Sequence, residues 1–264
     1  MQVTFTEKII TKKSDLLKRN VTCTFLTPKG DNIAGRLNLL ILNDGQEVSN
    51  LHLKTTLEDL TERNLINPVL VVAVHAGEER QQEYGTASQS DFQKRGSKAA
   101  LYSGFIKSEL MPFISEYSGI EKFNTTGFAG LSLGGLSAFD IAWNNPGLFD
   151  KTGVFSGSFW WRSKDLGKGY KETDRIMHKI VRATNGKPDL KIWLQTGTND
   201  EISDRNKNGI IDSIDDTVDL IKELEQKGYR RPADIQYVEM VGGNHSTETW
   251  AGAMPKFLVW AFGR

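Results

Sequence analysis

Hydrophobic and polar positions along the chain follow two different periods. Short apolar or alternating runs typical of β-strands recur eight times, and segments with helical spacing separate most of the later ones. The strand-like segments are residues 3–11, 20–27, 36–42, 68–75, 125–131, 151–156, 190–196 and 234–241. The helical segments are residues 51–63, 97–117, 132–144, 173–184, 214–227 and 247–262. The first two strand-like segments alternate between apolar and polar residues and are expected to pair antiparallel at a sheet edge, and residues 28–32 are expected to form a turn.

This alternation of strands and helices predicts an α/β fold with a mostly parallel, eight-stranded sheet and helices on both faces. Residues 69–74 are apolar without interruption, which is typical of a strand buried on both sides. Catalytic groups in such folds lie in loops at the carboxyl ends of the strands. Because the chain contains no repeat and no long linker, we expect one domain over residues 1–264.

Composition and charge narrow the classes of function. Hydrophobic residues make up 38% of the chain and charged residues 25%, which is typical of a soluble globular protein. The formal net charge is zero and the two signs are interspersed, so the sequence predicts neither nucleic-acid nor membrane binding. We therefore expect a small-molecule or glycan substrate. The sequence indicates no particular oligomeric state.

The N-terminal region and the lone cysteine bear on the compartment. Residues 1–20 lack the apolar core of a signal peptide, which favours a cytoplasmic protein; a periplasmic or secreted one is the alternative if a signal was removed. Cys23 is the only cysteine and lies in a strand-like run, so it cannot form an internal disulfide and is expected to be buried.

The segment Gly130-Leu131-Ser132-Leu133-Gly134 combines a catalytic pattern with the context that it requires. It follows a predicted strand and opens a predicted helix, as in the G-x-S-x-G nucleophile elbow, and so indicates the α/β-hydrolase fold. Glycines are needed because neighbouring backbones approach the strained serine closely. The pattern predicts Ser132 as a nucleophile and the amide of Leu133 as a first donor to an oxyanion.

A serine hydroxyl needs a base, and the chain offers four histidines. His245 lies between the last predicted strand and the last helix, which is where this fold places its histidine. His75 also ends a strand and is the alternative, but it precedes the serine, whereas the order in this fold is serine, acid, histidine. His52 and His178 lie in helical segments.

The acid should follow a strand between the serine and the histidine. Asp200 is the first carboxylate after the segment 190–196 and fits this place best. Glu201 and Asp204 lie nearby and remain alternatives.

Several further motifs, in order, resemble one family of α/β-hydrolases, which includes feruloyl esterases, enterochelin esterases, S-formylglutathione hydrolases and mycolyltransferases. The motifs are Leu40–Gln46, Glu79-Arg80, Glu83-Tyr84-Gly85, Gly96, Tyr102, Phe105-Ile106, Glu109–Ile114, Ser156–Trp161, and His245 followed by Trp250. The resemblance covers the chain from about Val21 onward. It implies that Gln46, which follows Asp-Gly, donates the second oxyanion-hole amide.

Together these residues predict a serine carboxylic-ester hydrolase that works through an acyl-enzyme and needs no cofactor for catalysis. Acyl transfer to a sugar or other alcohol is one alternative, and a non-catalytic binding protein is another. The resemblance favours carbohydrate-linked or aryl esters, with siderophore esters as a further alternative. Trp160 and Trp161 could form an aromatic platform for the substrate or belong to the core.

A second motif predicts a structural Ca²⁺ ion. The segment Asp204–Asp215 has oxygen-bearing side chains at loop positions 1, 3, 5, 9 and 12 and glycine at position 6, which is an EF-hand-type pattern. The expected ligands are Asp204, Asn206, Asn208, Ile210 through its carbonyl, Asp212 and Asp215. Aspartate at position 12, where glutamate is usual, resembles the dockerin loop. The alternative is an exposed turn without metal.

Overall fold

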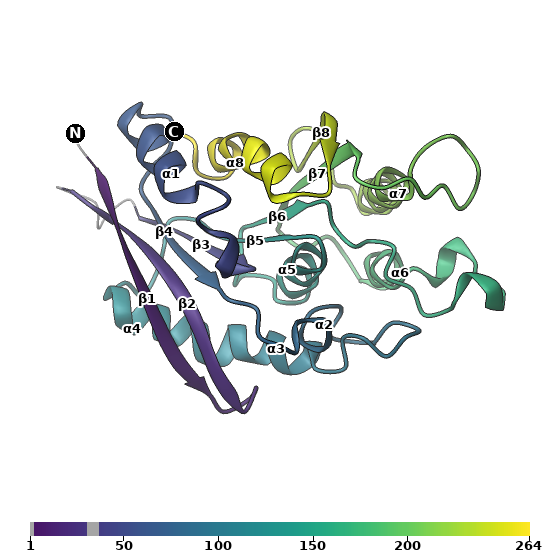
Figure 1. The fold of residues 1–264 in the computed structure, drawn as a ribbon, viewed down its shortest axis with the longest axis horizontal. Helices are drawn as coiled ribbons and strands as arrows, with labels where there is room; N and C mark the ends of the chain where they lie inside the picture. Colours follow the sequence, from purple (N-terminus) through teal and green to yellow (C-terminus); the bar gives the residue numbers. More distant parts are fainter. Residues whose placement is uncertain (1–2, 31–36) are drawn as a thin grey trace.

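A computed structural model describes residues 3–30 and 37–264. Its core is an eight-stranded sheet with the order β1-β2-β4-β3-β5-β6-β7-β8 (Figure 1). The strands are β1 (Thr4–Ser14), β2 (Arg19–Lys29), β3 (Asn38–Asn43), β4 (Val69–Val74), β5 (Thr126–Leu131), β6 (Lys151–Phe155), β7 (Lys191–Asn199) and β8 (Ile235–Asn244). Each of the eight predicted strands is therefore confirmed.

The pairing of the strands confirms the predicted fold class. β1 and β2 pair antiparallel at one edge of the sheet, β2 pairs antiparallel with β4, and every pairing from β4 to β8 is parallel. Arg36, the predicted start of the third strand, and residues 31–32 of the predicted turn lie outside the described residues. The turn was wrong at Pro28 and Lys29, which still belong to β2, whereas Gly30 forms a bend.

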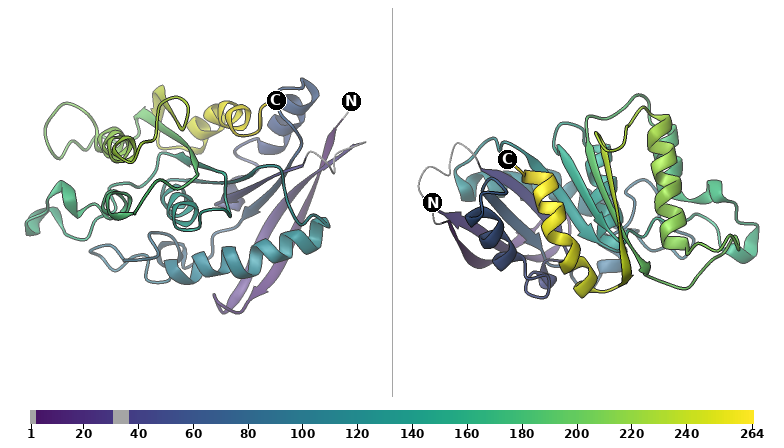
Figure 2. Two further views of the ribbon diagram at one scale, coloured as in Figure 1. Left: turned by 180° about the vertical axis from the view of Figure 1, so that it is seen from behind. Right: turned by 90° about the horizontal axis from the view of Figure 1, so that it is seen from above.

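Helices cover both faces of the sheet (Figure 2). One face carries α1 (Leu53–Glu62) and α8 (Thr247–Phe262), whose apolar residues share one core. The other face carries α3 (Ala99–Phe105), α4 (Met111–Ser118), α5 (Leu133–Asn144), α6 (Ile176–Ala183) and α7 (Asp212–Gln226). A π-helical segment, Ile106–Leu110, joins α3 to α4, so the single helix predicted over 97–117 is present with a local change in its winding.

Successive side chains of a buried strand point to opposite faces of the sheet and so pack into two separate hydrophobic cores, one on each face. Leu39 and Ile41 of β3 pack on the side of α3, α4 and α5, whereas Leu40 and Leu42 pack on the side of α1 and α8. Each of the four is fully buried, which explains the continuous apolar run. Among the helices that the structure describes, none has both the length and the apolar character needed to cross a bilayer.

The parallel strands place the predicted site residues at one edge of the sheet. Gln46 follows β3, Ser132 follows β5, Asp200 follows β7 and His245 follows β8. Because the carboxyl ends of parallel strands meet at the same edge, Ser132 and His245 come within hydrogen-bond distance although they lie 113 positions apart in the sequence.

Candidate active site

The turn between β5 and α5 holds Ser132 in a strained conformation. Its φ of 52° and ψ of −120° are rare for a residue with a side chain, and they project the hydroxyl away from the sheet. A Cβ on Gly130 would lie 2.3 Å from the carbonyl oxygen of Gly134, so the turn excludes any larger residue there. The N–H of Ser132 donates to the carbonyl of Phe155 on the neighbouring strand, over 2.8 Å. The predicted elbow is therefore present.

His245 is the histidine that reaches the serine. Its Nε2 lies 2.9 Å from the Oγ of Ser132. This is a hydrogen-bond distance, so the ring can accept the proton of the hydroxyl. His75 instead pairs through Nε2 with the hydroxyl of Thr24, over 2.8 Å. His178 is buried, and its Nε2 pairs with the backbone carbonyl of Asp216. The alternative assignment to His75 is thus unsupported by the geometry.

Asp200 is the carboxylate whose charge acts on His245. Desolvation by the surrounding protein lowers the pKa of His245, the charge of Asp200 raises it, and that of Arg80 lowers it. The carboxylate of Asp204 instead accepts hydrogen bonds from the N–H groups of Asn208 and Gly209, within the next loop. Burial and the charge of Asp212 raise the pKa of Glu201, which places that side chain toward α7.

Two residues that sequence reasoning did not single out fix the position of Asp200. The hydroxyl of Ser156 donates to Oδ1 of Asp200 over 3.1 Å, and the indole N–H of Trp250 donates to Ser156 Oγ over 2.9 Å. The edge of the Trp250 ring also packs on His245, with 5.1 Å between ring centroids. Both residues lie in motifs of the family resemblance, but only the folded chain brings them to the acid.

The other carboxylate oxygen of Asp200 depends on a glycine. Its Oδ2 accepts from the N–H of Gly197 over 3.0 Å. A Cβ on Gly197 would lie 2.3 Å from the carbonyl oxygen of Gly243 and 2.8 Å from Asp200 Oδ1. The strand end therefore approaches the acid so closely that only glycine fits.

Arg80 adds a positive charge at the mouth of the site. Its guanidinium forms a bidentate pair with Asp44, at 2.7 and 2.8 Å, and lies over the ring of Tyr84 at 5.1 Å. Arg80 belongs to α2 (Arg80–Glu83), which the sequence did not predict, because a four-residue helix is too short to show a period. Its charge reaches His245 and lowers the pKa of that ring.

The two predicted oxyanion donors lie in the first turns of two helical segments. Leu133 is the first residue of α5, so its N–H has no acceptor within its own helix. Gln46 lies in the 3₁₀ turn Gly45–Glu47, after Asp44, whose φ is 62°. The preceding Asn43 donates to the carbonyl of Gly134 over 2.8 Å and so holds this loop against the start of α5. This side-chain bond brings the loop of Gln46 beside the first turn of α5, as a shared oxyanion hole would require.

The two tryptophans after β6 differ in exposure, and the prediction for one of them needs correction. Trp161 is fully buried and packs against Gly85 and Gly96, so it belongs to the core and cannot contact a substrate. Trp160 is half-buried, and the guanidinium of Arg95 lies 4.9 Å from the centre of its ring. Trp160 alone remains a candidate for substrate contact.

The predicted calcium loop forms a tight turn with Gly209 at a φ of 86°. The side-chain amides of Asn206 and Asn208 both donate to Oδ2 of Asp215, so the side chains of three expected ligands converge on this oxygen. Asp212, in contrast, accepts from the N–H of Arg205 and pairs with its guanidinium. No cluster of three or more His, Cys, Asp or Glu side chains suited to a metal occurs among the described residues. Asparagine and carbonyl oxygens make up the rest of an EF-hand set, and the loop fits this set in part.

Comparison with known families agrees with this geometry. The family model described as "Putative esterase" matches residues 14–261, nearly the whole chain. The chain belongs to this esterase family. No curated protein sequence matches the chain.

Solved structures of esterases share the fold of this esterase-family chain. The enterobactin esterase FES from Shigella flexneri, in the presence of enterobactin, is 22% identical with a TM-score of 0.74; the match covers 97% of this chain and 58% of that one. A ferulic acid esterase is 17% identical with a TM-score of 0.70, over 98% of both chains. The siderophore hydrolase EstB from Aspergillus nidulans is 15% identical with a TM-score of 0.72, over 97% and 95%. The chain thus spans under three fifths of the enterobactin esterase, and at these identities the likeness concerns the fold.

Proposed function

We propose that this protein hydrolyses carboxylic esters through an acyl-enzyme on Ser132. The observation that carries the proposal is the 2.9 Å approach of His245 Nε2 to the hydroxyl of a serine with a φ of 52°. His245 takes the proton as Ser132 Oγ attacks the carbonyl carbon, and then returns it to the oxygen of the departing alcohol. Water, deprotonated by the same ring, attacks the acyl-enzyme and releases the acid.

The remaining roles follow from position. Asp200 orients His245 and stabilises its positive charge, because it is the carboxylate whose charge acts on that ring. The N–H groups of Leu133 and Gln46 stabilise the oxyanion, since both lie in the first turn of helical segments that Asn43 joins through its bond to Gly134. No step needs a metal ion.

The substrate proposed is a carbohydrate-linked or aryl ester. Trp160 supports it as a half-buried aromatic surface two residues after Ser158, whose hydroxyl lies 3.5 Å from that of Ser132. The ferulic acid esterase of matching length adds support by analogy. A siderophore ester is the second candidate, favoured by the fold shared with enterobactin esterase. Transfer of the acyl group to an alcohol remains an outcome of product analysis.

The test combines labelling of the nucleophile with a panel of esters. A fluorophosphonate probe should label the protein on Ser132, and Ser132→Ala should remove both labelling and hydrolysis while the melting temperature is retained. The panel contains aryl, acetyl-sugar and siderophore esters, with an added alcohol to reveal transfer. Labelling elsewhere, or activity that survives Ser132→Ala, would contradict the proposal.

We also propose that residues 204–215 bind one Ca²⁺ ion with a structural role. The convergence of Asn206, Asn208 and Asp215 supports this proposal, and the turn at Gly209 has the conformation that the sixth position of such loops requires. Asp204, Asn206, Asn208 and Asp215 would hold the ion by side-chain oxygens and Ile210 by its carbonyl. Asp212 would become a ligand only if its ion pair with Arg205 broke.

A further inference from the structure

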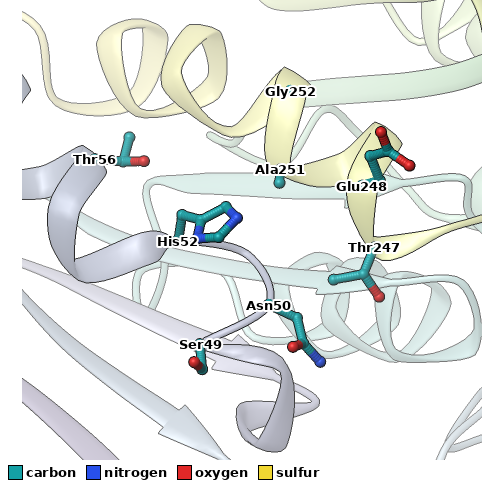
Figure 3. A pocket seen from close by; sticks show the side chains of 8 residues that line it. All are labelled: Ser49, Asn50, His52, Thr56, Thr247, Glu248, Ala251 and Gly252. Carbon is teal, nitrogen blue, oxygen red and sulfur yellow. The ribbon is translucent and has the colours of Figure 1, made fainter.

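A pocket whose lining includes Thr247, two residues after His245, lies between the segment that leads into α1 and the start of α8 (Figure 3). Its volume is about 670 Å³, within the usual range for small-ligand sites. Its polar lining consists of Ser49, Asn50, His52, Thr56, Thr247 and Glu248. Figure 3 shows that His52 and Thr247 project into the space between the two walls.

Both walls continue directly from the proposed catalytic residues. Thr247 comes two residues after His245, and Ser49 comes three residues after Gln46. One carboxylate joins the walls: Oε2 of Glu47 accepts from the amide of Asn50 over 2.9 Å and from the hydroxyl of Thr247 over 3.4 Å. The pocket is therefore held at a fixed place next to the histidine and the oxyanion loop.

The reaction determines which part of an ester would reach this side. His245 returns its proton to the oxygen of the departing alcohol, so the alcohol must lie next to that ring. The acyl group stays attached to Ser132. A pocket that begins two residues beyond the histidine is accordingly placed for the alcohol.

The chemistry of the lining determines the kind of alcohol. Among the described residues that line the pocket there is no lysine or arginine, and the single full charge is the carboxylate of Glu248, which disfavours anionic ligands. Ala251, Gly252 and the carbon atoms of the other side chains supply apolar surface about equal in extent to the polar surface. The side chains of Ser49, His52, Thr56 and Glu248 make no hydrogen bond to another described residue, so their donors and acceptors are free for a ligand.

From these observations we infer that the pocket between α1 and α8 binds the alcohol part of the ester, and that this alcohol is a neutral polyhydroxylated group such as a sugar. The inference rests on the proposed esterase function. Hydroxyl, amide, imidazole and carboxylate groups alternate around the pocket, and a sugar presents both donors and acceptors to such a lining.

The experiment compares two esters of one aryl acid, the methyl ester and the ester with the primary hydroxyl of methyl glucoside. His52→Gly and Glu248→Gln remove two of the free groups; glycine suits position 52 because His52 has a φ of 50°. Each variant should lower kcat/KM for the sugar ester about fivefold to tenfold and leave the methyl ester within twofold. Glu62→Gln, on the exposed far end of α1, is the matched control and should change neither.

The outcomes separate the two proposals. If the wild-type protein hydrolyses neither ester nor any other ester of the panel, the proposed function is wrong and the pocket inference falls with it. If it hydrolyses both esters and the two variants change neither, or lower both equally at an unchanged melting temperature, the pocket inference alone is wrong. A selective loss on the sugar ester supports it.

Discussion

Ser156 donates its hydroxyl proton to Oδ1 of Asp200 over 3.1 Å, from a backbone conformation with a φ of 47°. Such a conformation costs on the order of 1 kcal/mol for a residue with a side chain. Three bonds hold it: the N–H of Ser156 donates to Gln195, its hydroxyl donates to Asp200, and the same hydroxyl accepts from Trp250. Since Ser156 is buried, we interpret it as a residue that positions the acid.

Removing that hydroxyl should reduce turnover without weakening substrate binding. Ser156→Ala deprives Asp200 of one of its two recorded donors, so we expect kcat to fall about tenfold or more at an almost unchanged KM. Steady-state kinetics on one aryl ester would measure this. A change confined to the melting temperature would show that Ser156 is merely structural.

Trp250→Phe is the matched variant, because it removes the indole N–H and keeps an aromatic ring against His245. It leaves the hydroxyl of Ser156 in place, so we expect a smaller loss of kcat than for Ser156→Ala. A larger loss would move the main role to the ring contact with His245.

Substitution of the neighbouring acids should identify the acid of the site. Asp200→Asn removes the charge that favours protonated His245, and we expect kcat to fall by about 10³ to 10⁴. Asp204→Asn should leave kcat of the folded protein almost unchanged, because its carboxylate binds the N–H groups of its own loop. Equal losses, or a loss confined to Asp204→Asn, would reverse the assignment.

The pH profile should reflect the opposite influences on His245. Its ring must be neutral to accept the proton of Ser132, so kcat/KM should rise with pH through a pKa below the ordinary value of about 6.5, chiefly because of desolvation. Arg80→Gln removes a charge that lowers this pKa, so the acid limb should move to higher pH. Arg80→Lys keeps the charge and serves as the control. An acid limb that does not move would show that Arg80 has no electrostatic role.

Much of the fold and the main site could be predicted because local patterns specify them. The strands of a parallel sheet are buried on both faces, and this makes runs such as Val69–Val74 apolar throughout. The elbow was recognisable because the glycines around Ser132 are required by contacts within the same few residues.

Other features depend on contacts between distant segments and could not be predicted in this way. Ser156 meets Asp200 across 44 positions and Trp250 across 94, and no local pattern marks either contact. Trp161 is buried because Gly85 and Gly96 of a remote loop leave room for its ring. Sequence alone therefore could not decide between substrate platform and core for this residue.

The calcium proposal predicts an effect on stability. An ion that binds the folded protein and not the unfolded chain stabilises it by about 2.7 kcal/mol at a concentration a hundredfold above its Kd. For a domain of this size that corresponds to a rise in melting temperature of several degrees. We therefore expect Ca²⁺ to raise the melting temperature, and chelation to lower it, with little effect on kcat of protein that remains folded.

Asp204→Asn provides the control for this experiment, because it weakens the ion site and leaves Asp200 and His245 unchanged. The ion would fix a loop that begins four residues after Asp200, and the variant should abolish the calcium-dependent shift while retaining the melting temperature of the chelated wild-type protein. Arg205 opposes binding of the ion, because its guanidinium pairs with Asp212, one of the expected ligands. Wild-type melting curves that coincide with and without chelator would show that Asn206, Asn208 and Asp215 simply close an exposed turn.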